Sequence, residues 1–432
     1  MIVVRSAVVF AIGFTLIFFG LAGCDDAVTD PEDPEDDGGP TTDVIEISTI
    51  DELQLIGNDS DYPLDGDYVL VNDIDASETA EWNDGEGFEP IAQGEDDRFD
   101  GTLDGQGFSI DALVINRPDN EDVGLVSKTT NRAEFADLQL RDIEIIGGER
   151  NVGGLVGESQ AEKISDVRIE GSVEGDRFTV GLLAGSSSGE LYDINVEGIV
   201  RGERVGGITG RNRGNITRTS AVVEVRTRDG TRSGGLVGNN WQDSEISKSV
   251  VKGTVEGEHR IGGLVGHNSG TIRESRVEAD VSGEWTIGGL AGSNSDHASI
   301  TDAYVKGSVS GVVDGSSSGG IGGAVGGTRS GDGGGEISGV YVAADVVADH
   351  RWMGGLLGRN NDDIAISSAY WDLDKSGQEA GVGEGEYGEN VEGRTTEQMQ
   401  GDAAEANMTD FDFDDTWQVV EEDYPVLQWE SE

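Results

Sequence analysis

The segment whose residue types come nearest to a metal site is 372–377, which reads Asp-Leu-Asp-Lys-Ser-Gly. Oxygen-bearing side chains stand at its first, third and fifth positions and Gly at its sixth, as at the start of a calcium-binding loop. The twelfth position, a Glu in such loops, is Gly383 here. Asp372, Asp374 and Ser376 are therefore candidate calcium ligands, with an Asp-rich turn as the alternative. We expect no other cofactor.

Two patterns typical of hydrolases lack their structural context. Residues 185–189 satisfy the G-x-S-x-G pattern, but a nucleophile elbow needs a strand-to-helix turn and a positioned His. No helical pattern follows residue 189. His259, His267, His297 and His350 are spread along the chain, and none belongs to H-E-x-x-H. We therefore expect neither a serine hydrolase nor a zinc peptidase.

Acidic and basic side chains are distributed very unevenly. Carboxylate pairs are so abundant in this chain that their presence does not indicate any particular enzymatic reaction. Stacked repeats could align some of the few clustered arginines into one face, but exposed ion pairs with the surrounding acids are expected instead. These arginines are Arg201, Arg204, Arg211, Arg213, Arg218, Arg226 and Arg228.

The charge balance excludes one class of partner. The 432 residues include 85 Asp+Glu and 29 Lys+Arg, a formal net charge of -56. Duplex affinity rests on basic side chains that neutralise phosphates, so we expect no nucleic-acid partner. Acid-rich, Lys-poor surfaces are typical of halophilic proteins, because high salt screens the self-repulsion.

The N-terminus predicts export and a lipid anchor. Residues 1–23 combine Arg5 with an apolar run and end in Leu-Ala-Gly before Cys24, which resembles the bacterial lipobox. We expect a signal peptide, lipidation of Cys24 and membrane attachment through that lipid. The alternative is an uncleaved anchor helix. Residues 24–43 are acidic and rich in Pro and Gly, which predicts a disordered tether.

Internal repeats dominate the rest of the chain. The hexapeptide at 152–157, Val-Gly-Gly-Leu-Val-Gly, recurs in eight copies at intervals of 25 to 34 residues, and a shortened copy at 123–126 makes a ninth. Between copies runs an alternating segment such as 164–173, which predicts a strand with one buried face. Units of about 28 residues with few aromatics bury a core only by stacking. We therefore expect an all-β fold, a parallel β-helix or β-solenoid with terminal caps. Propeller blades need longer units.

The repeat, with its Gly-Gly-Leu-Val-Gly centre and turns such as Asn-Ser-Gly-Thr-Ile at 268–272, resembles the GLUG motif family. The resemblance covers residues 124–358 and departs from the pattern at Leu182 and in the Gly/Ser-rich insertion at 314–335. It implies a relationship to large surface proteins, including haemagglutinin-like adhesins and the non-catalytic parts of some secreted peptidases. Local irregularity is expected at the two departures.

Both flanks of the repeats are expected to act as caps. The N-terminal side, 44–122, is expected to form a cap and the first β-helix turns, and Thr49 and Glu52 there form a capping box that predicts a short helix ending near Gly57. The repeats proper span 123–368. The C-terminal side, 369–432, concentrates Trp residues that either cover the open end or form a carbohydrate-stacking platform.

Taken together, these features predict a non-catalytic, adhesin-like surface lipoprotein that contacts a cell-surface glycan or protein. It would lie on the extracellular face of the envelope, on the outer membrane if the host is a diderm. The alternatives are an extracellular lyase or glycosidase and an architectural envelope component. Asn58, Asn215 and Asn407 begin N-glycosylation sequons, whose use depends on the host.

Overall fold

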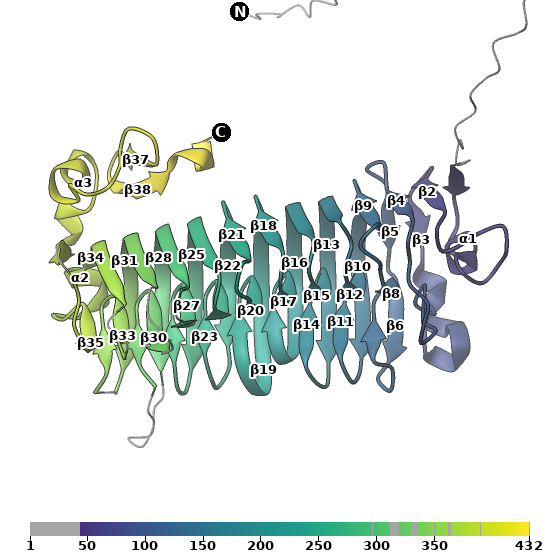
Figure 1. The fold of residues 1–432 in the computed structure, drawn as a ribbon, viewed down its shortest axis with the longest axis horizontal. Helices are drawn as coiled ribbons and strands as arrows, with labels where there is room; N and C mark the ends of the chain where they lie inside the picture. Colours follow the sequence, from purple (N-terminus) through teal and green to yellow (C-terminus); the bar gives the residue numbers. More distant parts are fainter. Residues whose placement is uncertain are drawn as a thin grey trace, which may run out of the picture. The chain divides into compact units, whose positions relative to one another are not determined.

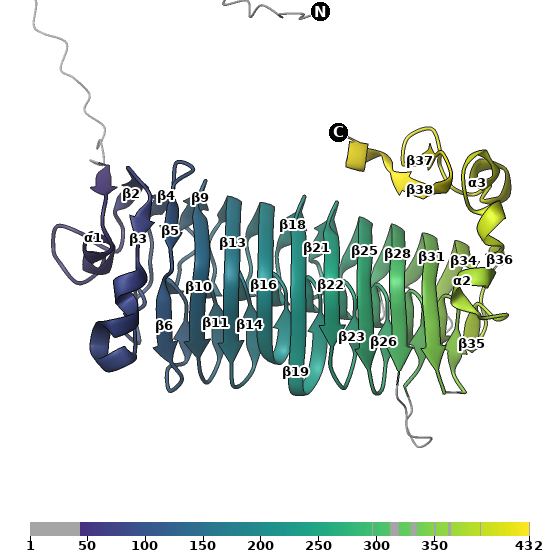
Figure 2. The same ribbon diagram turned by 180° about the vertical axis from the view of Figure 1, so that it is seen from behind.

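The computed structural model confirms the predicted fold, a parallel β-solenoid of about nine turns of roughly 28 residues. It describes residues 44–295, 297–311, 319–329, 335–349, 351–361, 364–388 and 390–431. Residues 42–432 form one compact unit. Successive strands lie side by side along the solenoid axis (Figure 1), and the reverse view shows the same order (Figure 2).

Each repeat contributes a long strand, a short strand and a strand of a second sheet. The long strands pair in parallel in a 26-stranded sheet and are β10 (Gln139–Gly147), β13 (Lys163–Gly175), β16 (Glu190–Gly206), β19 (Ser220–Gly234), β22 (Val250–Glu256), β25 (Thr271–Gly283), β28 (Ser299–Gly311), β31 (Glu336–Ala348) and β34 (Ala365–Asp372). Their shorter partners are β7 (Asp122–Val123), β9 (Glu134–Ala136), β11 (Asn151–Gly153), β14 (Thr179–Gly181), β18 (Asn215–Thr217), β21 (Glu245–Ser247), β23 (Ile261–Gly262), β26 (Ile287–Gly288), β29 (Ile321–Gly322), β32 (Met353–Gly354) and β36 (Val391–Arg394).

The second sheet has ten strands, one from each of the nine repeats and a last one, β35, from the segment that follows them. They are β8 (Val126–Lys128), β12 (Val156–Ser159), β15 (Ala184–Ser187), β17 (Thr209–Asn212), β20 (Val237–Asn240), β24 (Val265–Asn268), β27 (Ala291–Ser295), β30 (Val325–Arg329), β33 (Leu357–Arg359) and β35 (Val382–Glu384).

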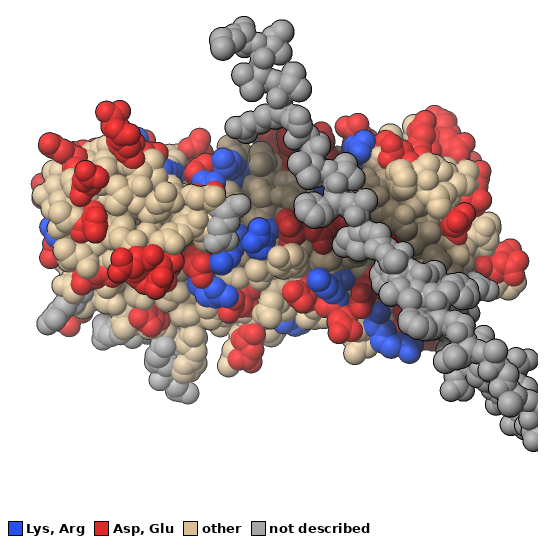
Figure 3. Space-filling model, turned by 90° about the horizontal axis from the view of Figure 1, so that it is seen from above, with Lys and Arg blue, Asp and Glu red and all other residues tan. Residues whose placement is uncertain are grey.

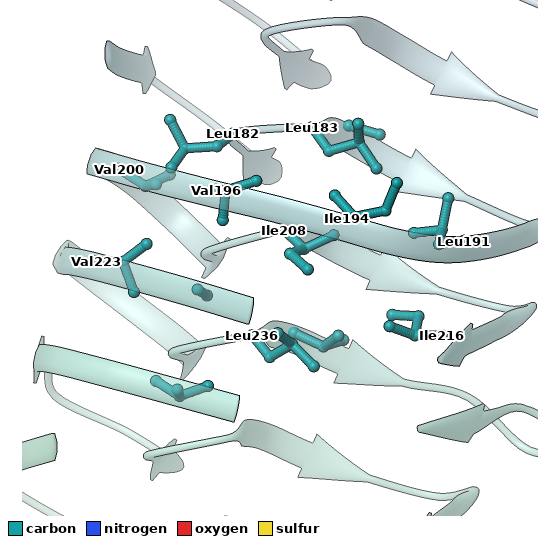
Figure 4. Packing of buried hydrophobic residues seen from close by; sticks show 14 of the residues in the cluster. Leu182, Leu183, Leu191, Ile194, Val196, Val200, Ile208, Ile216, Val223 and Leu236 are labelled. Atoms are coloured by element: carbon teal, nitrogen blue, oxygen red, sulfur yellow. The ribbon is translucent and has the colours of Figure 1, made fainter. Parts of the chain in front are cut away.

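The core is a set of apolar columns that run through the turns. Leu183, Ile208 and Leu236 occupy the same repeat position in consecutive turns, are fully buried and lie one after another in Figure 4. The expected alternation is confirmed in β13, where Val167 and Ile169 are buried and Arg168 is exposed. Stacking therefore supplies the hydrophobic burial that one repeat lacks.

The Gly-Gly pair marks a close approach of backbones rather than positive φ. A Cβ on Gly207 would clash with the carbonyl oxygen of Gly235 in the next turn. The predicted irregularity at Leu182 is wrong: its N–H donates to the Gly207 carbonyl at 2.9 Å, its side chain is buried, and the ladder continues. Leucine can replace the glycine of the other repeats here because its side chain lies in the apolar core.

A buried asparagine ladder closes the turns after the second sheet. The Nδ2 of Asn212 donates to Oδ1 of Asn240, and Asn240 donates to Asn268, both at 2.9 Å. Asn268 continues the ladder to Asn294 at 2.8 Å. Each buried Asn amide thus donates a hydrogen bond to the amide of the next turn, at the point where the backbone reverses direction.

The N-terminal elements complete the first turns. The predicted capping box is confirmed: Thr49 and Glu52 cap α1 (Ile50–Leu55) reciprocally. The remaining elements are β1 (Ile45–Ile47), β2 (Asp67–Leu70), β3 (Ile74–Asp75), 3-10 turns within Ser77–Gly85, β4 (Thr102–Asp104), β5 (Ser109–Asp111) and β6 (Val114–Arg117).

The C-terminal residues cover the last turn and the flank beside it. Trp371 is buried in the last turn, against Gly355 and Gly381. Residues 395–431, here the C-terminal module, pack through Trp417 and Tyr424 on a row of tyrosines on β28, β31 and β34. Aromatics therefore cover a flank as well as the end. The elements after β34 are α2 (Leu373–Ser376), a 3-10 turn Thr396–Gln398, α3 (Asp402–Asn407), β37 (Trp417–Val420), β38 (Asp423–Leu427) and a 3-10 turn Gln428–Ser431.

Candidate binding face

Two columns of mostly polar side chains run side by side along the solenoid. The first contains the residue just before each hexapeptide, and the second contains the residue seven positions later, in the second sheet. Cross-strand pairing keeps both columns in register from turn to turn. We call them the paired columns; they comprise Asn151, Thr179, Arg204, Arg232, Arg260 and Thr286, beside Glu158, Ser186, Arg211, Asn239, His267 and Ser293.

The glycines of the repeat bring the paired columns together. A Cβ on Gly185, which precedes Ser186, would clash with the backbone of Asn151 in the previous turn. The second-sheet strand can therefore lie directly against the short strand. The repeat consequently places two polar positions, seven residues apart in sequence, beside each other. Small side chains there, such as Thr179 and Ser186, are buried, whereas the arginines are partly exposed.

A hollow lies on the columns near each end of the repeats. The first, of about 550 Å³, includes Asp122, Lys128, Arg150 and Glu158 in its lining. The second, of about 190 Å³, includes Arg260, Thr286, Ser293 and Arg359. The second hollow is lined by members of both columns. The first is lined by Glu158 and by Asp122 and Lys128, which pair with Asn151 and Glu158 and so extend the columns by one turn. The two hollows therefore belong to one extended face.

The first hollow contains a buried carboxyl group. Asp122 is 6% exposed, and burial raises the pKa of its carboxyl group. Its Oδ1 accepts a hydrogen bond from Asn151 Nδ2 at 2.6 Å. Lys128 Nζ donates to the carbonyl oxygens of Gly94 and Glu95 at 2.8 and 3.0 Å. The hollow therefore contains a buried carboxyl group with a raised pKa and a lysine held by two carbonyl groups.

Three arginines occupy the middle of this face. Arg204 and Arg211 are neighbours across the columns, and Arg213 follows two residues later. Burial lowers the pKa of Arg211, and the charges of Arg213 and Arg204 lower it further. None of the three forms a salt bridge with a described residue. Positive charge is thus concentrated where no described carboxylate lies within salt-bridge distance.

Exposed aromatic rings flank these arginines. The Arg204 guanidinium lies 5.8 Å from the centre of the Phe178 ring, and that of Arg213 lies 4.6 Å from the Trp241 ring. Phe178 is 45% exposed and Trp241 is 42% exposed. Such contacts hold the guanidinium groups over the rings and leave much of each ring accessible.

Arginines on the outer face of the long strands behave differently. Arg226 pairs with Glu224 at 2.9 Å, Arg201 approaches the same carboxylate at 3.9 Å, and Arg168 lies 3.9 Å from Glu197. Here the expectation of exposed ion pairs is confirmed, whereas it is wrong for Arg204, Arg211 and Arg213. The difference follows from strand register, because the residues paired with these three arginines in adjacent turns are largely neutral or basic. The side chain of Arg228 lies outside the described residues.

Figure 3 shows the distribution of charge on one face of the molecule. Acidic side chains are spread over most of that surface, while Lys and Arg gather nearer its middle. The chain's large negative charge is therefore not uniform.

The candidate calcium ligands take part in protein hydrogen bonds. Asp372 is fully buried and caps α2, where its Oδ1 accepts from the backbone N–H groups of Asp374 and Lys375 at 2.8 and 2.9 Å. Its Oδ2 accepts from Thr396 at 2.6 Å and from Tyr424 at 2.5 Å. Asp372 thus fastens the C-terminal module to the last turn.

The other two candidates serve neighbouring backbone groups. Asp374 Oδ2 accepts from the backbone N–H of Thr396 at 3.0 Å, and Ser376 Oγ accepts from that of Gln378 at 3.2 Å. No group of three or more described His, Asp or Glu residues could hold a metal ion. Calcium binding at 372–377 stays a prediction.

The remaining predicted sites do not converge with the columns. Asn58 follows α1, Asn215 opens β18 and Asn407 ends α3, where its Nδ2 donates to the Ala403 carbonyl at 2.8 Å. Asn58 and Asn215 are exposed. Cys24 lies outside the described residues, as do the signal peptide and tether. In the part that the structure describes, no helix is long and apolar enough to cross a membrane.

The hydrolase-like patterns also remain separate. Ser187, at the centre of the G-x-S-x-G match, is buried in β15 and its Oγ has no hydrogen-bond partner. His267 Nδ1 lies 2.7 Å from Ser293 Oγ, and His259 packs on Trp285 with ring centres 4.5 Å apart. His350 lies outside the described residues.

Sequence reasoning missed the paired columns as a unit. The signal was present: in each full repeat, the residue before the hexapeptide and the residue after it are seven positions apart. Recognising the site required knowing that the hexapeptide reverses the chain and brings those two positions together.

Replacing Asp122 by Asn is expected to stabilise the fold at neutral pH. The raised pKa means that the folded state disfavours the charged form of the Asp122 carboxyl group. Its contribution to the free energy of unfolding is therefore fully present below the ordinary pKa of 3.8. That contribution is lost as the pH rises through the raised pKa of the folded state. Thermal unfolding should show Asp122→Asn above wild type near pH 7, and the gain should vanish below about pH 3.8. Glu121→Gln, at the neighbouring exposed residue, is the control. A gain that persists in acid would contradict this account.

Comparison with known proteins identifies the repeat. Residues 229–256 and 283–310 match the GLUG motif family. A 138-residue stretch is 38% identical to halomucin of Haloquadratum walsbyi (strain DSM 16790 / HBSQ001), covering 32% of this chain and 2% of that protein. The chain thus matches only a small part of that relative.

Two solved structures also share a degree of similarity. A candidate immunoglobulin A1 protease from Bacteroides ovatus is 14% identical, with 89% of this chain and 92% of that chain covered and a TM-score of 0.34. A structure named IgA1 Protease is 16% identical, with 84% and 24% covered and a TM-score of 0.36. The family match alone shows that the repeats from which the solenoid is built include GLUG motifs.

Proposed function

We propose that this chain is a non-catalytic, adhesin-like surface protein whose paired columns contact a cell-surface glycan or protein. The observation that supports this most strongly is the register of the columns, which repeats polar positions on one rigid face. Many individually weak contacts along such a face combine into strong attachment. The face thus favours an extended ligand.

Placement outside the cell is part of the same proposal. The similarity to halomucin and the GLUG repeats support a surface protein. Lipidation of Cys24, followed by the acidic segment 24–43, would hold the solenoid away from the membrane, on the outer membrane if the host is a diderm. The acid excess fits a halophilic host.

A retention assay tests the binding function. The full-length chain would be incubated in high salt, with and without calcium, with neutral and acidic polysaccharides and with intact cells, and both retained protein and released sugar fragments would be measured. We expect retention without fragments. Release of fragments would overturn the non-catalytic proposal, and absence of retention on every surface would overturn binding.

One observation favours a second candidate, a polysaccharide-active enzyme. Asp122, whose pKa is raised by burial, shares the first hollow with Glu158 and Lys128. A raised pKa favours the general-acid role of a carboxyl group, and a second acidic side chain nearby could complete a pair of the kind that cleaves glycosidic bonds. If fragments are released, Asp122→Asn should abolish their release and leave retention intact.

A further inference from the structure

We propose that the middle of the paired columns binds an anionic polysaccharide bearing carboxylate or sulfate groups. The site, which we call the arginine segment, comprises Arg204, Arg211 and Arg213 with Phe178 and Trp241. This inference rests on the proposed binding function and names the ligand class for that same face.

Among the described residues, no carboxylate lies within salt-bridge distance of the arginine segment. The Arg204, Arg211 and Arg213 guanidinium groups form no salt bridge with a described residue, although acids outnumber bases by 85 to 29 in the chain. The Nε atom of Arg204 is buried without a hydrogen-bond partner. Gathering like charges raises the free energy of the unliganded face, and a bound anion would lower it. The segment is therefore ready for an anionic group.

The donor chemistry suits carboxylate and sulfate. A guanidinium presents parallel N–H donors in a planar fork that matches two oxygens of one anionic group. Contacts with the Phe178 and Trp241 rings constrain Arg204 and Arg213. Constrained side chains lose less entropy when they bind. Three such groups on one face can therefore hold several anionic groups of one ligand.

The layout favours a polymer over a single small anion. Consecutive turns of a parallel sheet are about 4.8 Å apart, so Arg204 and Arg232, paired in adjacent turns, repeat a basic position along the axis. The hollows near Asp122 and near Thr286 lie on the same columns at either side. A chain laid along the columns would cross the arginine segment and reach both hollows.

The aromatic rings favour a sugar polymer over other polyanions. Phe178 and Trp241 are large, exposed apolar surfaces beside the arginines. The apolar faces of sugar rings stack on such side chains, while their acidic substituents meet the guanidinium groups. Duplex nucleic acid carries a charge every 1.7 Å or so, so a protein of net charge -56 repels it far more strongly. An acidic polypeptide has the charge but lacks sugar ring faces.

The surrounding acids give this site an unusual salt dependence. At about 0.1 M salt the screening length is about 10 Å, so the polyanion experiences repulsion from much of the surface. At about 1 M salt it falls to about 3 Å, which removes most of the repulsion while contacts at hydrogen-bond distance persist. Affinity should therefore rise between these salt concentrations, opposite to the usual behaviour of polyanion-binding proteins.

The experiment uses dextran sulfate, polygalacturonate, neutral dextran and polyglutamate as probes of the full-length chain at both salt concentrations. We expect dextran sulfate, polygalacturonate or both to bind more tightly than dextran and polyglutamate, and more tightly at about 1 M than at about 0.1 M salt. The two acidic glycans distinguish sulfate from carboxylate as the preferred group. Equal binding of neutral dextran, or tighter binding of polyglutamate, would overturn the inference.

A matched pair of triple variants tests the residues. Arg204→Gln, Arg211→Gln and Arg213→Gln together should weaken binding by about a hundredfold or more, since each charge-assisted contact contributes about tenfold. Arg168→Gln, Arg201→Gln and Arg226→Gln change the net charge equally in paired residues of the outer face and should change affinity less than about threefold. Equal losses in the two variants would overturn the inference.

Two further measurements keep the result interpretable. Thermal unfolding should show that the arginine-segment variant remains folded. If the variant is unfolded, Arg211→Lys takes its place. This substitution keeps the positive charge but removes the planar fork of donors, so it should lower the affinity for the polysaccharide. If the wild type retains cells or neutral glycan and the arginine-segment variant does so equally, this inference fails while the proposed binding function stands. If the wild type retains nothing, both fail.

Discussion

Replacing Gly198 by Ala is expected to lower the free energy of unfolding by about 3 kcal/mol or more. Gly198 lies on β16 opposite Gly171 and has a φ of +152°, a conformation that strains an L side chain. A Cβ there would also press against the carbonyl oxygen of Gly171 in the previous turn. The turns would have to separate, which would weaken the parallel ladder on both sides. Chemical denaturation monitored by circular dichroism measures the change.

Gly327→Ala is the matched control for this prediction. Gly327 is also a buried strand glycine, but the nearest atoms to its added Cβ are 3.6 Å away, an ordinary contact. Alanine should leave the stability within about 1 kcal/mol of wild type or raise it slightly. A Gly198→Ala protein as stable as Gly327→Ala would show that the turns do not approach as closely as described.

Replacing Trp417 by Ala is expected to destabilise the docking of the C-terminal module by about 3–5 kcal/mol. Trp417 is fully buried, with ring centres 4.6 Å from Phe411 and 5.6 Å from Tyr341 of β31. Its loss removes the largest side chain between the module and the tyrosine row. Because the solenoid has a separate core, protease should cleave the module from the variant while the repeats resist digestion.

Trp241→Ala provides the comparison within the same protein. Trp241 is exposed on the binding face, so its removal should shift the unfolding midpoint little and leave the module resistant to protease. Simultaneous digestion of repeats and module in Trp417→Ala would contradict the view that the module is an attachment to an independently stable solenoid.

The fold could be predicted because repetition makes the signal strong. A hexapeptide in eight copies predicts stacking, and alternation in segments such as 164–173 predicts which side chains enter the core. The helix after Thr49 follows from a local capping box. These features depend on neighbouring residues, so the sequence displays them directly.

Contacts between distant segments could not be predicted in the same way. Tyr304, Tyr341 and Tyr370 form one row only because β28, β31 and β34 pair in register, and the C-terminal module reaches that row from over a hundred residues beyond Tyr304. Asp372 fits a calcium-loop pattern in sequence, yet its partners Thr396 and Tyr424 come from later segments. Its role as an anchor depends on tertiary packing.

The candidate binding face was predicted only in part. The arginines near residue 210 stand out in an acidic chain, but sequence alone does not separate Arg201, which lies near Glu224, from Arg204, which has no such partner. That difference arises because Arg201 lies on the outer face of β16 whereas Arg204 opens the segment that turns toward the second sheet. Register, rather than composition, determines which cations remain available.

Hydroxyl-radical footprinting of the full-length chain, with and without the polysaccharide that it retains, tests the central claim most directly. Phe178 and Trp241 are exposed beside the paired columns, whereas Tyr387 is 49% exposed beyond the repeats. Binding along the columns predicts strong protection of Phe178 and Trp241 and unchanged labelling of Tyr387. Protection of Tyr387, or of Val222 on the outer face of β19, with Phe178 and Trp241 still fully labelled, would contradict the account.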